Sequence, residues 1–246
     1  MLADPVEALA VTAVSILLSY AAFRQNMLTA RGSASAFAVS AAIGLFGGLS
    51  WLLLILSFVA AAFITTRFKL LDKAKMGLQE GRRGERGSRN VVANSMPAVC
   101  VALLSTLLAG YAPQSYFAML FTVAIGSATA DTLASEIGVI NRHPRLITTM
   151  KPVPPGTDGG VSALGTAASF GGALFIAVAG YALIVLLGDT MPLWSIPFTA
   201  VLGFSGSVID SILGATLERR GIIGKQSNNI SSIVLACLAA AVLLAL

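Results

Sequence analysis

The feature that most constrains this chain is a series of long apolar segments that recurs from one end to the other. Only 11% of the residues are charged, compared with about 25% in soluble domains. The pattern predicts an all-α, polytopic integral membrane bundle of seven or eight transmembrane helices, in which residues 1–246 form a single transmembrane domain. Because a helix needs about 20 residues to cross a bilayer, the predicted spans are 6–23, 32–48, 50–66, 91–110, 115–134, 160–187, 193–213 and 229–246.

The basic residues predict how these spans are oriented. All 16 Lys and Arg residues lie in or beside predicted loops on one side of the membrane, and the positive-inside rule makes that side cytoplasmic and puts the N-terminus outside. Topology and attraction to anionic headgroups explain the net charge of +5 without a nucleic-acid partner. Trp51 and Trp194 map to the outer ends, where we expect them at headgroup level. The cytoplasmic loops are 24–31, 67–90, 135–159 and 214–228, with 67–90 the most basic.

Carboxylates inside two predicted spans indicate a functional site. GSATADTLASEIG, residues 126–138, carries Asp131 and Glu136 on a polar helical face, and GFSGSVIDSILGATLE, residues 203–218, repeats the design around Asp210. Ionisable groups within a membrane are costly and usually face a protein interior or a wet cavity. We therefore expect these aspartates to converge at the cytoplasmic end of the bundle.

A third polar stretch, GTDGGVSALGTAAS, opens the apolar segment that follows it at residues 156–169. Its glycines allow backbone N–H groups to approach an anion at a helix N-terminus. Asp158 would repel a phosphate there unless Lys151 or Mg²⁺ lies between them. Small residues also suit tight helix packing, so the glycines and hydroxyls taken alone favour a packing role.

Acidic groups, glycine turns and basic loops at one face fit a Mg²⁺–phosphate site. Phosphoryl transfer requires mainly positioning and charge neutralisation. A phosphate monoester acceptor is largely dianionic at neutral pH and needs no general base. The sequence contains no Walker motif and no metal-binding histidine cluster, which argues against a soluble nucleotidase and zinc chemistry.

Five motifs occur in order along the chain: GERGSRNVVAN (84–94), ADTLASEIG (130–138), GTDGGVSALG (156–165), GFSGSVIDSILGATLE (203–218) and NNISS (228–232). Together they resemble an integral membrane family known as domain of unknown function 92, which includes transmembrane protein 19 and plant phytyl-phosphate kinase. The resemblance implies a Mg²⁺-dependent membrane kinase that converts an isoprenyl monophosphate, such as phytyl or geranylgeranyl phosphate, to the diphosphate. The implied donor is a nucleoside triphosphate, CTP or ATP.

Carried onto this chain, the resemblance assigns roles to individual residues. The implied metal ligands are Asp131, Asp210 and Glu136, and the implied catalytic groups are Asp131, Asp210, Lys151 and Asp158. The isoprenyl chain is expected between helices, in contact with apolar side chains. Membrane lipids are a further expected partner. The implied nucleotide-binding residues are Arg83, Arg86, Arg89, Asn94, Gly156, Thr157, Gly159, Gly160, Ser162, Ser211, Asn228 and Asn229.

Two other function classes remain open at this level. An ion- or proton-coupled transporter of a small anionic substrate also uses intramembrane carboxylates and glycine-broken helices, although its acidic residues would lie near the bilayer midplane. A non-catalytic lipid-binding or assembly subunit would tolerate neutral replacements at both aspartates. The sequence does not indicate an oligomeric state.

Overall fold

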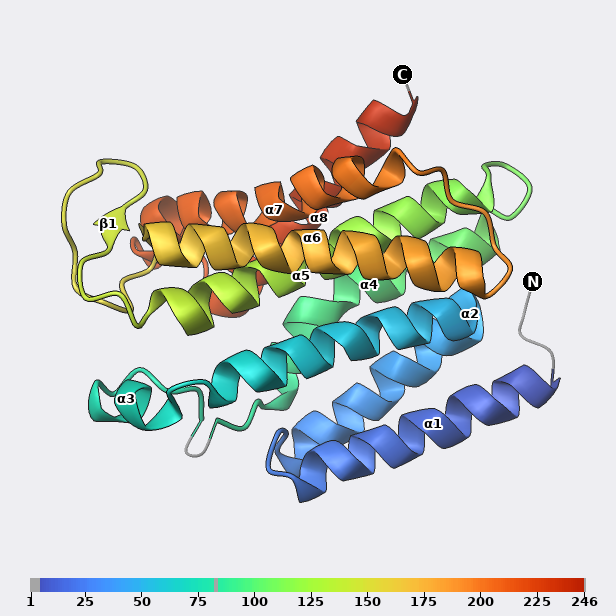
Figure 1. Cartoon of the computed structure of the whole chain (residues 1–246), viewed down its shortest axis with the longest axis horizontal. Helices are drawn as coiled ribbons and strands as arrows, with labels where there is room; N and C mark the ends of the chain where they lie inside the picture. Colours follow the sequence, from blue (N-terminus) through green and yellow to red (C-terminus); the bar gives the residue numbers. More distant parts are fainter. Residues whose placement is uncertain (1–4, 82–83, 246) are drawn as a thin grey trace.

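The computed structural model describes residues 5–81 and 84–245 and is a bundle of long helices (Figure 1). In the part of the chain it describes, seven helices are long and apolar enough to cross a membrane. The sixth of these, α7, continues into a short π-helical turn, η1. The elements are α1 (Pro5–Arg24), α2 (Ala30–Arg67), α4 (Ser88–Leu107), α5 (Gln114–Gly138), α6 (Ala163–Leu186), α7 (Ser195–Leu213), η1 (Gly214–Glu218) and α8 (Lys225–Ala245).

Helix α2 contains two of the predicted spans. Its 38 residues would form a rod of roughly 57 Å, which exceeds the bilayer core of about 30 Å. The helix breaks at Gly48, whose φ of 83° lies in the left-handed region that glycine tolerates. Figure 1 shows the chain reversing there, so that the two limbs of α2 correspond to the predicted spans 32–48 and 50–66.

The longer connections gather at one end of the bundle, which we call the basic end (Figure 1). It carries the short helix α3 (Leu70–Lys75) and a small antiparallel pair of strands, β1 (Arg145–Leu146) and β2 (Gly160–Val161). The hydropathy pattern did not predict these three elements, because each is too short to have a periodicity of its own. The predicted membrane spans are confirmed to within a few residues at most ends.

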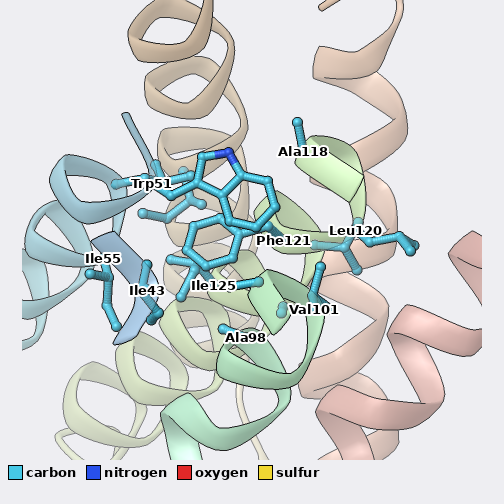
Figure 2. Packing of buried hydrophobic residues seen from close by; sticks show 14 of the residues in the cluster. Ile43, Trp51, Ile55, Ala98, Val101, Ala118, Leu120, Phe121 and Ile125 are labelled. Carbon is cyan, nitrogen blue, oxygen red and sulfur yellow. The ribbon is translucent and has the colours of Figure 1, made fainter. Parts of the chain in front are cut away.

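Helix α5 is the centre of the bundle and packs against α2, α4, α6, α7 and α8. At its core Trp51 stacks on Phe121, with ring centroids 4.3 Å apart (Figure 2). Trp51 lies close to the turn of α2 at Gly48, but its side chain is 1% exposed, so it packs inside the protein and does not face lipid. Trp194, by contrast, is exposed.

Glycines bring α6 and α7 unusually close to α5. A Cβ atom on Gly138 would lie 3.1 Å from the Cα atom of Gly165 in α6, and one on Gly203 in α7 would lie 3.2 Å from the Cα atom of Gly126. Close backbone approach at small residues is how membrane helices associate tightly. These glycines therefore act in packing, and the packing places the polar faces of α5 and α7 together.

Candidate functional site

A cavity of about 460 Å³ opens at the basic end of the bundle. Its walls are formed by the last turns of α5 and α7, by the first turns of α6 and α8, and by two connecting segments, 78–80 and 156–162. The sequence-predicted site residues that line it are Asp131, Glu136, Gly156, Thr157, Asp158, Gly159, Gly160, Ser162, Asp210, Ser211, Asn228 and Asn229.

Asp131 of α5 and Asp210 of α7 meet inside this cavity. Their carboxyl groups are close enough to interact directly with each other, and the Ser232 hydroxyl donates to Asp210 Oδ1 at 3.1 Å. Two carboxylates this close repel each other unless they share a proton or a cation. The convergence expected for these two aspartates is therefore present, although they lie 79 positions apart in the chain.

The chain widens from an α-helix to the π-helical η1 just after Asp210. Such π-turns often occur at functional sites. Here the Asp210 carbonyl accepts from the Gly214 backbone N–H and also from Asn228 Nδ2 at 3.1 Å, and the same amide donates to Glu218 Oε2 at 2.9 Å. Asn228 thus ties the start of α8 to the end of α7, while its own Oδ1 is buried and has no partner among the described residues.

The glycine-rich turn packs directly on η1. Gly159 has a φ of 74°, and a Cβ atom there would lie 2.6 Å from Ala215 Cα, so no larger residue fits without moving the turn. The turn then leads into β2 and into Ser162, whose Oγ accepts from the Gly165 backbone N–H at 3.1 Å and caps α6. The N-termini of both α6 and α8 border the cavity, and the partial positive charge at a helix N-terminus favours anions.

The charged side chains lining the cavity are predominantly acidic. Among the described residues its lining contains six carboxylates and one ammonium group, that of Lys225. Lys225 Nζ lies 3.5 Å from Glu80 Oε1. Sequence reasoning missed both residues because they are in a loop and at a helix start, where a charged residue usually means only solvent exposure. An anionic ligand would therefore need additional positive charge to bind here.

Glu136, also on the cavity wall, has a separate set of partners. Its Oε2 lies 2.6 Å from Lys73 Nζ, and its Oε1 accepts from the Thr66 hydroxyl at 2.8 Å and lies 3.3 Å from Arg86 Nη2. Lys73, in α3, is fully buried. Lys73 therefore has a structural partner in addition to the topology and headgroup attraction expected to account for most of the basic charge. Because two cations already hold Glu136, its carboxylate is not part of the proposed metal site.

Four other predicted residues that the structure describes lie outside the cavity lining. Lys151 is exposed in the loop between β1 and β2, and Arg89 is exposed near the start of α4. Asn94 does not line the cavity but is hydrogen-bonded to a residue that does, because its Oδ1 accepts from Asn229 Nδ2 at 3.4 Å. Arg86 contacts Glu136 as described, and Arg83 lies outside the described residues.

The residues present fit a Mg²⁺ ion. Within residues 5–81 and 84–245 no group of three or more His, Cys, Asp or Glu side chains is arranged to hold a metal. Mg²⁺, however, commonly binds through one or two carboxylates and keeps its other positions for water and substrate phosphates. The touching pair Asp131 and Asp210 supplies the two carboxylates, and the unpartnered Asn228 Oδ1 is a further oxygen donor.

The fold and the cavity define a multi-pass membrane protein with an acidic, glycine-walled site at one end of its helical bundle. Comparison with known proteins specifies this further: the chain belongs to the family described as integral membrane protein DUF92, whose model matches residues 13–241. No solved structure matches the chain.

Three relatives span archaea, bacteria and plants. An uncharacterised membrane protein of Methanocaldococcus jannaschii is 34% identical over 191 residues, covering 75% of this chain and 72% of the relative. An uncharacterised membrane protein of Synechocystis is 32% identical, covering 84% and 78%. The chloroplastic protein VTE6 of Arabidopsis thaliana is 29% identical over 212 residues, covering 84% of this chain and 61% of the plant protein.

Proposed function

We propose that this protein is a Mg²⁺-dependent membrane kinase that transfers a phosphoryl group from a nucleoside triphosphate, CTP or ATP, to an isoprenyl monophosphate. The observation that carries the proposal is the contact between Asp131 and Asp210 inside a cavity at the basic end of the bundle. The resemblance of five motifs to a family that includes plant phytyl-phosphate kinase supports the same reaction.

The charge of the cavity supports a metal–phosphate ligand in particular. Six carboxylates would repel a bare triphosphate, whereas a triphosphate carrying Mg²⁺ brings the positive charge that the lining lacks. Asp131 and Asp210 would hold the ion, which when bound would offset negative charge on the phosphate oxygens.

The remaining lining residues would position the donor. Backbone N–H groups of the turn at 156–160 and of the first turns of α6 and α8 would donate to phosphate oxygens. Lys225 would add positive charge. The hydroxyls of Thr157, Ser162 and Ser211 are further donors.

The acceptor chemistry explains why no general base is needed. An oxygen of the dianionic lipid phosphate forms a new bond to the γ-phosphorus, and the bond between that phosphorus and the bridging oxygen of the donor breaks. The nucleoside diphosphate leaves with the electron pair of that bond, and no proton moves. His143, the single histidine of the sequence, is exposed in the loop after α5 and does not line the cavity.

A screen of donors against acceptors tests this function. Purified protein in lipid nanodiscs with Mg²⁺ would be given CTP, ATP, GTP or UTP together with phytyl, geranylgeranyl or farnesyl phosphate, with undecaprenol and dolichol as alcohol controls. We expect an isoprenyl diphosphate from the monophosphates and no product from the alcohols. Failure of every donor–acceptor pair, or uptake of a small anion into proteoliposomes without any phosphoryl transfer, would overturn the proposal in favour of a transporter.

A further inference from the structure

A second cavity, of about 380 Å³, lies between α1, α2 and α4. Its volume is within the range of about 300 to 1,000 Å³ that is usual for small-molecule sites. Most of its walls are aliphatic and aromatic side chains, such as Leu18, Val59 and Phe63. Among the described residues that line it, Arg86 is the charged one, and Asn90 and Asn94 lie near it in sequence on α4. The pocket is thus apolar with a polar, cationic end.

Arg86 connects this apolar pocket to the carboxylate cavity. Its guanidinium lies 3.5 Å from the hydroxyl of Thr132, the residue after Asp131, and 3.3 Å from Glu136 Oε1. A third contact reaches the Thr66 hydroxyl at 3.4 Å. All three are longer than the roughly 2.7 to 2.9 Å of a strong charge-assisted hydrogen bond. The guanidinium is therefore held loosely and can donate to a ligand.

The ion pairs around Glu136 involve two cations, Lys73 and Arg86. Lys73 also donates to the backbone carbonyls of Thr65 and Thr66, so its donors are used within the protein. Arg86 is the one of these two cations that also lines the apolar pocket, where it would complement an anionic headgroup attached to a hydrocarbon chain.

One layer of side chains separates the two cavities. Asn94 lines the apolar pocket, Asn229 lines the carboxylate cavity, and the two amides are hydrogen-bonded to each other at 3.4 Å. A group bound at Arg86 and Asn94 would therefore lie next to the site proposed for the metal and the donor phosphates.

The apolar pocket is bordered by exposed residues of α1 and α2 through which a lipid could reach it. Helix α1 lies at the edge of the bundle, where its extensive packing is against α2 (Figure 1). Leu18 on α1 lines the pocket and is 37% exposed, and Ala60 on α2 also lines it and is exposed. A lipid chain could enter sideways between these two helices.

We propose that this pocket holds the hydrocarbon chain of the acceptor lipid, with the lipid phosphate at Arg86 and directed toward Asp131. The inference rests on the proposed function and states where its acceptor binds. It moves Arg86 from the expected role of binding the nucleotide to that of positioning the acceptor. The two substrates would then approach from opposite sides of the wall formed by Arg86, Asn94 and Asn229.

Photo-cross-linking tests the location without requiring turnover. Geranylgeranyl phosphate carrying a diazirine on its terminal isoprene unit would be irradiated with the full-length protein in nanodiscs, and the labelled peptides would be mapped by mass spectrometry. We expect labelling in α1 and in the second limb of α2, around Leu18, Val59 and Phe63. Labelling confined to α6, α7 or α8 would overturn the proposal.

Filling the pocket provides a matched pair of variants. Ala60→Phe places a ring at the exposed mouth of the pocket, so it need not disturb folding. Ala239→Phe makes the same change on the exposed face of α8, away from both cavities. We expect Ala60→Phe to reduce cross-linking about tenfold and Ala239→Phe to leave it unchanged. Equal labelling of the two variants would contradict the assignment.

The headgroup is tested by comparing the phosphate probe with the corresponding diazirine-bearing alcohol. The wild-type protein should label at about tenfold lower concentration with the phosphate, because a hydrogen bond to a charged group is lost with the alcohol. Arg86→Gln should remove this preference while retaining labelling by the alcohol, which also shows that the pocket is folded. A phosphate preference that survives Arg86→Gln would exclude Arg86 as the anchor.

These measurements separate the two proposals. Labelling of the pocket without phosphoryl transfer to any acceptor would contradict the proposed kinase function and support the lipid site. Phosphoryl transfer with labelling outside the pocket would support the kinase and contradict the lipid site.

Discussion

At the scale of single residues, the contact between Asp131 and Asp210 sets the behaviour of the cavity. Without a cation the two carboxylates repel each other, so Asp210→Asn should raise the melting temperature of the protein in EDTA. The same change should abolish stabilisation by Mg²⁺, which for an ion at 100 times its Kd is worth about 2.7 kcal/mol. Thermal unfolding in detergent with and without Mg²⁺ measures both effects. Asp189→Asn, in an exposed outer loop, is the control and should change neither.

The buried ion pair between Lys73 and Glu136 gives a second prediction at this scale. Lys73→Met leaves the Glu136 carboxylate with the longer Arg86 contact as its remaining ion pair, beside the Thr66 hydroxyl. Breaking a buried pair in this way costs about 3–5 kcal/mol. We expect a large fall in the unfolding midpoint. Lys75→Met, on the exposed side of the same short helix, should have little effect.

The double variant Lys73→Met with Glu136→Gln completes this test. Removing both charges takes away the uncompensated carboxylate, so much of the lost stability should return. A double variant that is no more stable than Lys73→Met alone would show that the pair is not coupled as the structure indicates.

At the scale of the elements, the glycine turn and η1 form one unit. In Gly159→Ala the new alanine would have to adopt a left-handed backbone conformation, which costs about 1–2 kcal/mol. Its methyl group would also overlap Ala215. We expect it to displace the turn and to lower kcat/KM for the nucleotide by tenfold or more. Gly171→Ala, where nothing lies within 4 Å of the added methyl group, should leave activity intact and slightly stabilise α6. Equal activity of the two variants would show that the turn is not part of the site.

The elements that the sequence predicts well are those governed by hydropathy. Spans are read from runs of apolar residues, and the reversal within α2 follows from two predicted spans separated by a single position near Gly48. Hydropathy does not predict helix α3 or the strands β1 and β2, because the positions of these short elements depend on tertiary contacts. Lys73 is the clearest example: nothing in its local sequence indicates that it reaches a glutamate 63 positions away.

At the scale of the whole molecule, the orientation in the membrane is predicted by the basic loops. In a variant without Cys100 and Cys237, a cysteine introduced at Arg142 should be protected from a membrane-impermeant maleimide in intact cells. A cysteine at Asp189, at the other end of the bundle, should be labelled. The reverse pattern would place the carboxylate cavity outside the cytoplasm and away from its proposed nucleotide.

The site as a whole was only partly predictable from the sequence. Asp131 and Asp210 could be selected because carboxylates inside apolar spans are costly and need a reason. The apolar pocket could not be, since its walls are ordinary aliphatic side chains whose enclosure depends on how α1, α2 and α4 pack. Lys225 and Glu80 were missed for the same reason, because their pairing exists only in three dimensions.

The most direct test of the central claim is transfer of labelled phosphate by the purified protein in nanodiscs, comparing wild type with Asp131→Asn and Asp210→Asn. With γ-labelled CTP or ATP, Mg²⁺ and geranylgeranyl phosphate, the wild type should produce labelled diphosphate. Both variants, expressed and folded to the same extent, should lose at least 1,000-fold in kcat, about 4 kcal/mol of transition-state stabilisation. Comparable turnover by either variant, or no labelled product from the wild type with any donor, would contradict the claim.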